Sequence, residues 1–332
     1  MLDHMKTLAV VVAQAVVAPF LVLFHRPDPR WSYVEALLQR LLNLVTPTDV
    51  GFLRLTYAIY GRFQRHLFFP PLETVDVPAV KGMWYGDAST PPADCAVVVL
   101  FVHGGGFVCG TADAMSFDAI RPLLASLRRQ GVSAVRVFSV SYDLAPQACY
   151  PRQIQQTYDA YRWLLDLGVS PTKIVVMGDS AGGNCALSLL QQGLKDHMPM
   201  PACAVLVSPW VDLHMTKPSY DAATDSFTKA TVFKWRDVYL NGDSTHATVT
   251  AASPGLQSLR GLPSLMVTFG KNELMADDLE LFVAKAKASH VNVVAYSHPY
   301  LFHDFPTLPL GQPSRDGMDA IGRFIISRAT TT

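Results

Sequence analysis

The chain has 332 residues, of which half are hydrophobic and 16% are charged, and its 27 basic and 27 acidic side chains give a formal net charge of zero. This composition supplies enough apolar material for a large core, which excludes a disordered chain. The balanced charge and the lack of a basic run argue against a nucleic-acid partner. No Gly/Ser-rich linker divides the sequence, so a single domain with a cap is expected.

The cysteines are dispersed and show no Cys-x-x-Cys spacing, so neither a zinc site nor a dense disulfide framework is expected. They are Cys95, Cys109, Cys149, Cys185 and Cys203. The sequence also lacks an Asn-x-Ser/Thr glycosylation acceptor. Both observations favour free buried thiols in a cytosol-facing protein, with no cofactor and no metal.

The first apolar segment, residues 8–24, is uncharged and reaches the lower length limit for crossing a bilayer. Three interpretations are open. The segment is a membrane anchor or interfacial helix, with Arg26 and Arg30 keeping the rest of the chain on the cytosolic side, or an apolar helix of the cap, or a cleaved signal peptide. The signal peptide fits poorly because the apolar run continues past the small-residue site. Association with an internal membrane is therefore one hypothesis, and the oligomeric state is left open.

Apolar spacing within residues 31–70 predicts two helices separated by Pro47. Further along, apolar runs alternate with helical patterns such as residues 154–167. This alternation predicts an α/β fold with a mainly parallel sheet and helices on both faces. Residues 75–84 are expected to supply an antiparallel edge of that sheet.

The apolar run at residues 96–102 predicts a strand, and the sequence HGGGF follows it at 103–107. Three glycines leave the backbone amides free to point at a developing oxyanion. The arrangement is typical of the oxyanion-hole loop of lipases and esterases. The alternative is an ordinary glycine-rich turn after a strand. His103 is expected to hold the loop in shape rather than to transfer protons.

The pentapeptide GDSAG at 178–182 follows the apolar run 174–177 and precedes a helical leucine pattern. It predicts a nucleophile elbow, in which Ser180 occupies a strained turn from strand to helix. Small residues at Gly178 and Gly182 let the strand and the helix approach each other. The positive end of the helix dipole would then lie at the serine. Gly-x-Ser-x-Gly also occurs by chance, so the motif alone does not identify a catalytic serine, and the glycine loop at 103–107 is needed as a second signal.

Two late apolar runs, residues 265–269 and 291–296, precede loops that carry carboxylates and histidines. The residues of such a triad follow the chain order Ser, acid, His, so these two loops are expected to supply the acid and the base. Our choice is Glu273 as acid and His303 as base. Two alternatives stay open.

Asp277 is the rival acid, although Asp277 and Asp278 are expected to begin the next helix, where carboxylates favour the dipole. His298 is the rival base, although it directly precedes a proline.

Further motifs occur in the same order: YDLAP at 142–146, SPWVDL at 208–213 and HDF at 303–305. With the two glycine motifs, they make residues 73–325 resemble the hormone-sensitive-lipase-like branch of the α/β-hydrolases. Within that branch the chain is similar to fungal esterases related to steryl acetyl hydrolases. The resemblance implies a mainly parallel eight-stranded sheet with helices on both faces and a helical cap.

The resemblance also implies how the chain is divided. Residues 1–70 would form the N-terminal apolar helix and cap helices, 71–210 and 251–332 the α/β-hydrolase core, and 211–250 a cap insertion. The aromatic residues of this insertion would line an acyl or alcohol pocket or simply pack the cap, and packing is expected for any single one. They are Tyr220, Phe227, Phe233, Trp235 and Tyr239.

Carried over by position, the resemblance makes Ser180 the nucleophile and His303 the base. The acid falls on Glu273, where most relatives carry Asp. The oxyanion donors fall on the backbone amides of Gly105, Gly106 and Ala181.

These roles imply a serine esterase or deacetylase that cleaves short acyl esters of a hydrophobic alcohol through an acyl-enzyme, with no cofactor. The resemblance favours an acetyl group, and the alcohol would be a sterol, a polyketide or another secondary metabolite. An acyltransferase that uses the same acyl-enzyme is one alternative. A non-catalytic ligand-binding receptor of the same fold is another, and the presence of His303 argues against it.

Overall fold

The computed structural model describes residues 2–329 and contains one eight-stranded sheet with the order β1-β2-β4-β3-β5-β6-β7-β8. The first two strands and β4 pair antiparallel, and all later pairings are parallel. The strands are β1 (Glu73–Val77), β2 (Val80–Gly86), β3 (Val97–Val102), β4 (Val135–Val140), β5 (Ile174–Asp179), β6 (Cys203–Val207), β7 (Ser264–Gly270) and β8 (Val293–His298). The predicted fold class and antiparallel edge are confirmed.

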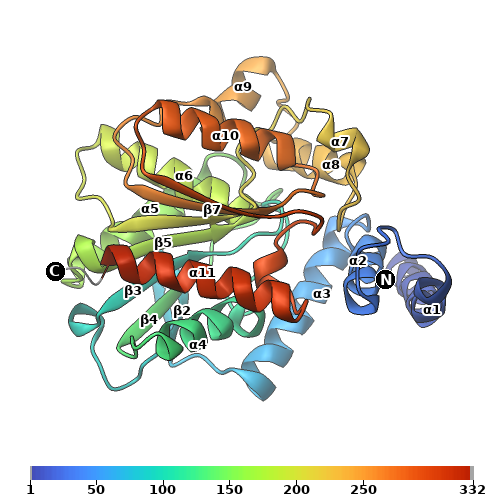
Figure 1. Ribbon diagram of the computed structural model, residues 1–332, viewed down its shortest axis with the longest axis horizontal. Coiled ribbons are helices and arrows are strands. Elements are labelled where there is room, and N and C mark those ends of the chain that lie inside the picture. Colours follow the sequence, from blue (N-terminus) through green and yellow to red (C-terminus); the bar gives the residue numbers. More distant parts are fainter. Residues whose placement is uncertain (1, 330–332) are drawn as a thin grey trace.

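The central strands are buried along their whole length because helices cover both faces of the sheet (Figure 1). Even-numbered residues of β3, such as Leu100, pack with α5, α6 and α10, while odd-numbered residues, such as Phe101, pack with α4 and α11. These helices are α4 (Arg121–Arg129), α5 (Arg152–Asp166), α6 (Ser180–Lys195), α10 (Ala276–Ala288) and α11 (Gln312–Ala329). The alternation along each strand thus builds two apolar layers.

Three helices precede the sheet and lie at one side of it (Figure 1). They are α1 (Leu2–Phe24), α2 (Tyr33–Val45) and α3 (Val50–Phe63). The prediction of two helices around Pro47 is confirmed, and Ser32 begins α2 with a capping box. The indole of Trp31 contacts the ring of Phe302 at 5.1 Å and donates to the carbonyl of Tyr300 at 2.6 Å. The N-terminal segment therefore packs directly against the loop that carries His303.

Helix α1 packs on α2 and leaves much of its apolar surface exposed. Among the described residues, no helix is both long and apolar enough to cross a membrane. The apolar side chains of α1 that are about half exposed or more are Val10, Val12, Val16, Val17, Phe20, Leu21, Leu23 and Phe24.

The segment between β6 and β7 forms α7 (Ser219–Ala222), α8 (Lys229–Tyr239) and α9 (His246–Ala251). Helices α7 and α8 fall within the predicted insertion at 211–250, and the division into core and cap remains a prediction. Short single-turn segments connect the other elements: η1 (Gln64–Phe68), η2 (Pro92–Asp94), η3 (Ser116–Ile120), η4 (Pro171–Lys173), η5 (Pro254–Leu256) and η6 (Phe305–Thr307). All five cysteines are free and four of them are buried, as expected.

Candidate active site

Ser180 stands at the junction of β5 and α6 with a backbone φ of 52°. A left-handed φ is unusual for a residue with a side chain, and it is the strain expected of a nucleophile elbow. A Cβ on Gly178 would lie 2.4 Å from the carbonyl oxygen of Gly182, and one on Gly182 only 2.0 Å from that of Val102. The two glycines therefore permit the close approach that the sequence predicted.

The HGGGF loop lies directly against this serine. A Cβ on Gly104 would be 3.1 Å from the Ser180 Cβ, and the Gly104 amide donates to Oδ2 of Asp179 at 3.0 Å. The next two glycines have φ angles of 107° and 59°, which turn the loop sharply. Within residues 2–329, the amides of Gly105 and Gly106 donate to no backbone or side-chain acceptor. Ala181 lies in the first turn of α6, where backbone amides have no intrahelical acceptor. Free amide donors thus gather beside the serine.

His103 has a structural environment, as the sequence suggested. Its Nδ1 donates to the carbonyl of Gly104 at 2.8 Å, and its ring stacks on Tyr142, whose hydroxyl donates to the His103 carbonyl at 2.7 Å. Burial lowers the pKa of His103 to about 4, so the ring is neutral at physiological pH. These contacts hold the glycine loop in its turn.

Aromatic side chains from the predicted insertion form one wall of the site. A Cβ on Gly106 would lie 2.5 Å from the indole of Trp235 on α8. The ring of Phe227 lies 5.7 Å from that indole and 4.7 Å edge-on from the imidazole of His303. Both aromatic residues therefore border the space between the glycine loop and the histidine, in addition to packing the insertion.

The imidazole of His303 and the carboxylate of Glu273 come together as expected. His303 Nδ1 lies 3.6 Å from Glu273 Oε1, and both side chains are buried. The other carboxylate oxygen of Glu273 accepts from the Ser208 hydroxyl at 2.7 Å and from the Gly270 amide at 3.0 Å. Two donors therefore fix Glu273 through Oε2, and Oε1 is left toward the imidazole.

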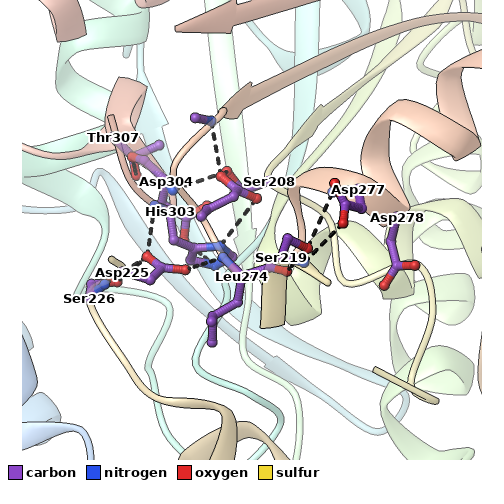
Figure 2. A network of polar contacts seen from close by, with 12 residues as sticks. Ser208, Ser219, Asp225, Ser226, Leu274, Asp277, Asp278, His303, Asp304 and Thr307 are labelled. Atoms are coloured by element: carbon purple, nitrogen blue, oxygen red, sulfur yellow. Dashed lines mark hydrogen bonds and ion pairs between the residues drawn. The ribbon is translucent and has the colours of Figure 1, made fainter. Parts of the chain in front are cut away.

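The rival acid is used elsewhere. Asp277 accepts from the backbone amide of Ser219 at 2.9 Å, on the far side of the network drawn in Figure 2. Asp277 and Asp278 lie in the first turn of α10, as predicted. The rival base, His298, ends β8 with its ring against Tyr300 and Phe305.

Asp225 joins the acid loop to the base loop, a role that the sequence did not indicate. Its carboxylate accepts from the His303 amide at 3.0 Å and from the Leu274 amide at 2.8 Å (Figure 2). The Asp225 carbonyl accepts from the side-chain amides of Gln39 at 2.8 Å and Asn43 at 2.6 Å, both on α2. Because Asp225 lies in no motif, only the fold could reveal this clamp.

Asp304 is a second site residue whose role the sequence did not show, although it stands in the HDF motif. Its Oδ2 lies 3.3 Å from Nε2 of His303, and its amide donates to the Ser208 hydroxyl at 3.0 Å. Figure 2 shows Ser208, His303 and Asp304 close together. Neither ring nitrogen of His303 has a hydrogen-bond partner among the described residues, so a bond to Ser180 is not formed here.

The charges of this buried cluster favour a protonated imidazole. Burial by itself would lower the pKa of His303, but the carboxylates of Asp304, Glu273 and Asp225 outweigh it and raise that pKa to about 10. Burial also raises the pKa of the Asp179 carboxyl to about 7, although His303 opposes this shift. The cluster therefore binds protons more tightly than the same groups do in water.

Together these groups suit acyl transfer: a hydroxyl at a strained corner, free amide donors beside it, and an imidazole oriented by a buried carboxylate. Within residues 2–329 there is no group of three His, Cys, Asp or Glu side chains arranged to hold a metal ion.

A family model described as the alpha/beta hydrolase fold matches residues 99–307, and the chain belongs to this family. The chain is 28% identical over 303 residues to an acetyl-hydrolase of Streptomyces hygroscopicus, covering 87% of this chain and 95% of that relative. It is 29% identical over 228 residues to an esterase of Acinetobacter venetianus, covering 68% of this chain and 73% of that relative.

Solved structures agree with these relatives. An esterase of the bacterial hormone-sensitive lipase family superposes with a TM-score of 0.73 at 28% identity, over 88% of this chain and 98% of its own. An esterase/lipase from an uncultured bacterium superposes with a TM-score of 0.71 at 25% identity, over 96% of this chain and 97% of its own. The protein is thus a carboxylesterase-type hydrolase, with hormone-sensitive-lipase-like esterases among its relatives.

Proposed function

We propose that the protein hydrolyses esters through an acyl-enzyme in which Ser180 is the nucleophile, His303 the base and Glu273 the acid. The observation that carries this proposal is the position of Ser180, at a φ of 52° on the elbow and against the glycine loop. The free amides of Gly105, Gly106 and Ala181 are the oxyanion donors. A hydroxyl in this setting is activated only if a base can reach it.

The reaction begins when the imidazole Nε2 of His303 turns from Asp304 toward Ser180 and takes the hydroxyl proton as Oγ attacks the ester carbonyl. Glu273, 3.6 Å from Nδ1, stabilises the imidazolium that forms. The amide donors bind the tetrahedral oxyanion, and the protonated imidazole gives its proton to the leaving alcohol. Water, deprotonated by the same imidazole, then attacks the acyl-enzyme and releases the acid.

For the substrate, we propose a short acyl group, acetyl above all, on a hydrophobic alcohol such as a sterol or another secondary metabolite. The relative from Streptomyces hygroscopicus, named an acetyl-hydrolase, supports the acyl group. The aromatic wall of Phe227 and Trp235 supports an apolar alcohol, because flat apolar rings suit contact with aromatic faces. A relationship to fungal steryl acetyl hydrolases is part of the same proposal about the substrate.

Labelling with a fluorophosphonate probe tests the nucleophile. The wild type is expected to be labelled at Ser180 and to hydrolyse a short-chain aryl ester, whereas Ser180→Ala should fold normally and lose both properties. Ser188→Ala is a matched control, because it removes a partly buried hydroxyl from the same helix. Full activity in Ser180→Ala would refute the assignment.

We also propose that α1 lies on a lipid surface, where an apolar alcohol would be concentrated. Its last turns expose Phe20 by 64%, Leu23 by 65% and Phe24 by 89%, and the basic Arg26 follows. An apolar helix with a cationic flank binds the interface of anionic bilayers. The unmodified chain should sediment with anionic vesicles, and the double variant Phe20→Ser with Phe24→Ser should sediment less. Equal sedimentation of both proteins would contradict the proposal.

A further inference from the structure

The imidazole of His303 has a carboxylate at each of its two nitrogens. Glu273 Oε1 lies 3.6 Å from Nδ1, and Asp304 Oδ2 lies 3.3 Å from Nε2. The acid of a serine hydrolase acts at one nitrogen only, and the other nitrogen exchanges the proton with the nucleophile. Asp304 therefore stands at the very atom that must accept the Ser180 proton in the proposed mechanism.

The backbone of Asp304 holds its carboxylate at this place. The residue has a φ of 58°, a left-handed value that Asp tolerates better than most side chains. Its amide donates to the Ser208 hydroxyl at 3.0 Å, and its carbonyl accepts from the Thr307 amide at 2.9 Å. With the main chain fixed on both sides, the short side chain has little freedom to leave the imidazole.

Asp304 also has no competing partner among the described residues. Its Oδ1 is buried without a hydrogen-bond partner, and Oδ2 faces only the imidazole. Burial raises the pKa of this carboxyl well above its ordinary value, while the nearby His303 charge opposes the shift. The Asp304 side chain is 16% exposed and that of His303 4%, so little solvent screens the pair and the charges interact strongly.

The other groups that face this histidine carry the same sign of charge. Glu273 follows β7, Asp225 lies in the insertion and Asp179 ends β5, and each influences the charge on the imidazole or is influenced by it. From α3, the partly buried Tyr57 is neutral in its ordinary form; the loss of solvent, and then the charges of Asp179 and Asp304, raise the pKa of its phenol well above the ordinary value. The carboxylates that act on His303, those of Asp304, Glu273 and Asp225, therefore all favour its protonated form.

We propose that Asp304 is a positioning residue that holds the protonated imidazole of His303 through Nε2 and so sets the pH at which this imidazole becomes a base toward Ser180. This inference rests on the proposed function. While Nε2 keeps its proton and faces Asp304, it cannot accept another from the serine. Loss of that proton as the pH rises frees Nε2, so the enzyme should work best under alkaline conditions.

The variant Asp304→Asn tests this, because an amide keeps the shape of the side chain, tolerates the left-handed backbone and removes the charge. We would measure the rate of fluorophosphonate labelling of Ser180 against pH. The midpoint of the acid limb should move down by about 1 pH unit or more, the usual effect of removing one close opposite charge. Asp304→Gly provides a second variant that fits the same φ.

A second readout does not depend on catalysis. The midpoint of the His303 ring titration can be followed by nitrogen NMR in the Ser180→Ala background, with the signal assigned by His303→Gln. It should fall by the same amount when Asp304→Asn is added. Asp277→Asn is the matched control, since its carboxylate contacts Ser219 and not the imidazole, and it should leave both midpoints in place.

The outcomes separate the two proposals. If Asp304→Asn and Asp304→Gly lose labelling equally at every pH and the midpoints do not move, Asp304 is merely structural and the inference is wrong. If wild-type Ser180 is never labelled while the ring titration still shifts, the proposed function fails but the hold of Asp304 on the imidazole stands. Parallel shifts in both readouts support the inference.

Discussion

The hydroxyl of Ser208 donates to Oε2 of Glu273 at 2.7 Å and at the same time accepts from the backbone amide of Asp304 at 3.0 Å. Ser208 directly follows β6 with a left-handed φ of 40°. One side chain at the end of a central strand thus connects the loop that carries Glu273 with the loop that carries His303. The spacing of the two loops depends on it.

Ser208→Ala should weaken catalysis through the contacts of Ser208 with Glu273 and Asp304, and not through a contact with the substrate. The buried carboxylate of Glu273 would lose a charge-assisted hydrogen bond, worth about 1.5–3 kcal/mol. We expect kcat/KM for an aryl ester to fall roughly 10- to 100-fold, with a lower Tm. Ser188→Ala removes a hydroxyl that has only a 3.5 Å contact with Asn184 and should change neither value. Wild-type activity in Ser208→Ala would contradict the role of this bond.

Glu273→Gln should lower kcat by about 10³- to 10⁴-fold, because an amide cannot stabilise the imidazolium and favours the wrong tautomer. The matched substitution Asp277→Asn acts on the rival acid, which accepts from the Ser219 amide. It should keep wild-type turnover. Steady-state kinetics on both variants decide between the two carboxylates, and the reverse ranking would reassign the acid to Asp277.

Gly106→Ala should disrupt the glycine loop that we propose as the oxyanion hole, because its φ is 59° and a Cβ would lie 2.5 Å from the Trp235 ring. Displacing the amide donors should cost about 10²- to 10³-fold in kcat. Gly242→Ala is the control, with a φ of 79° and no atom within 4 Å of a Cβ. It carries the same kind of backbone strain but should leave kcat unchanged. An equal loss in both variants would point to general destabilisation.

Asp278→Asn should stabilise the protein at alkaline pH and not at acidic pH. Burial raises the pKa of Asp278 from 3.8 to about 7, and the nearby Asp212 adds to the shift. The folded state therefore binds the proton more tightly than the unfolded state, so the wild type loses stability as the pH rises from the lower to the higher value. The hydroxyl of Tyr220 can donate to an amide oxygen as it does to the carboxylate at 3.0 Å.

The Tm of Asp278→Asn, measured by calorimetry, should exceed that of the wild type by roughly 2–5 °C at pH 8 and match it near pH 4. A constant difference at both pH values would mean that ionisation of this carboxyl is not the cause.

Local patterns were sufficient to predict the fold and the elbow. The apolar run before Ser180 and the glycines at Gly178 and Gly182 define a strand, a turn and a helix within a few residues, and the structure has this arrangement. The glycine loop after His103, with its free amides, could also be predicted from the local sequence. These features depend on neighbours in the chain, where periodicity and glycine content are informative.

The support around the histidine could not be predicted in this way. Asp225 lies in an insertion without a motif, and it becomes important only because the fold brings it to the amides of Leu274 and His303. Asp304 was visible in the HDF motif, but the direction of its carboxylate follows from a left-handed backbone that one sequence does not reveal. Such contacts join residues far apart in the chain, and the spacing of these residues in the sequence follows no helix or strand periodicity.

The two amide side chains of α2 that bind the Asp225 carbonyl have a practical consequence for anyone who shortens this protein. Gln39 and Asn43 precede the first strand and meet no reacting atom, yet they support the carboxylate that fixes the histidine loop. A version trimmed to the sheet and its flanking helices would retain Ser180, Glu273 and His303, the residues of the proposed triad, and still leave the imidazole poorly placed. The amino-terminal helices therefore help to hold the His303 loop in position.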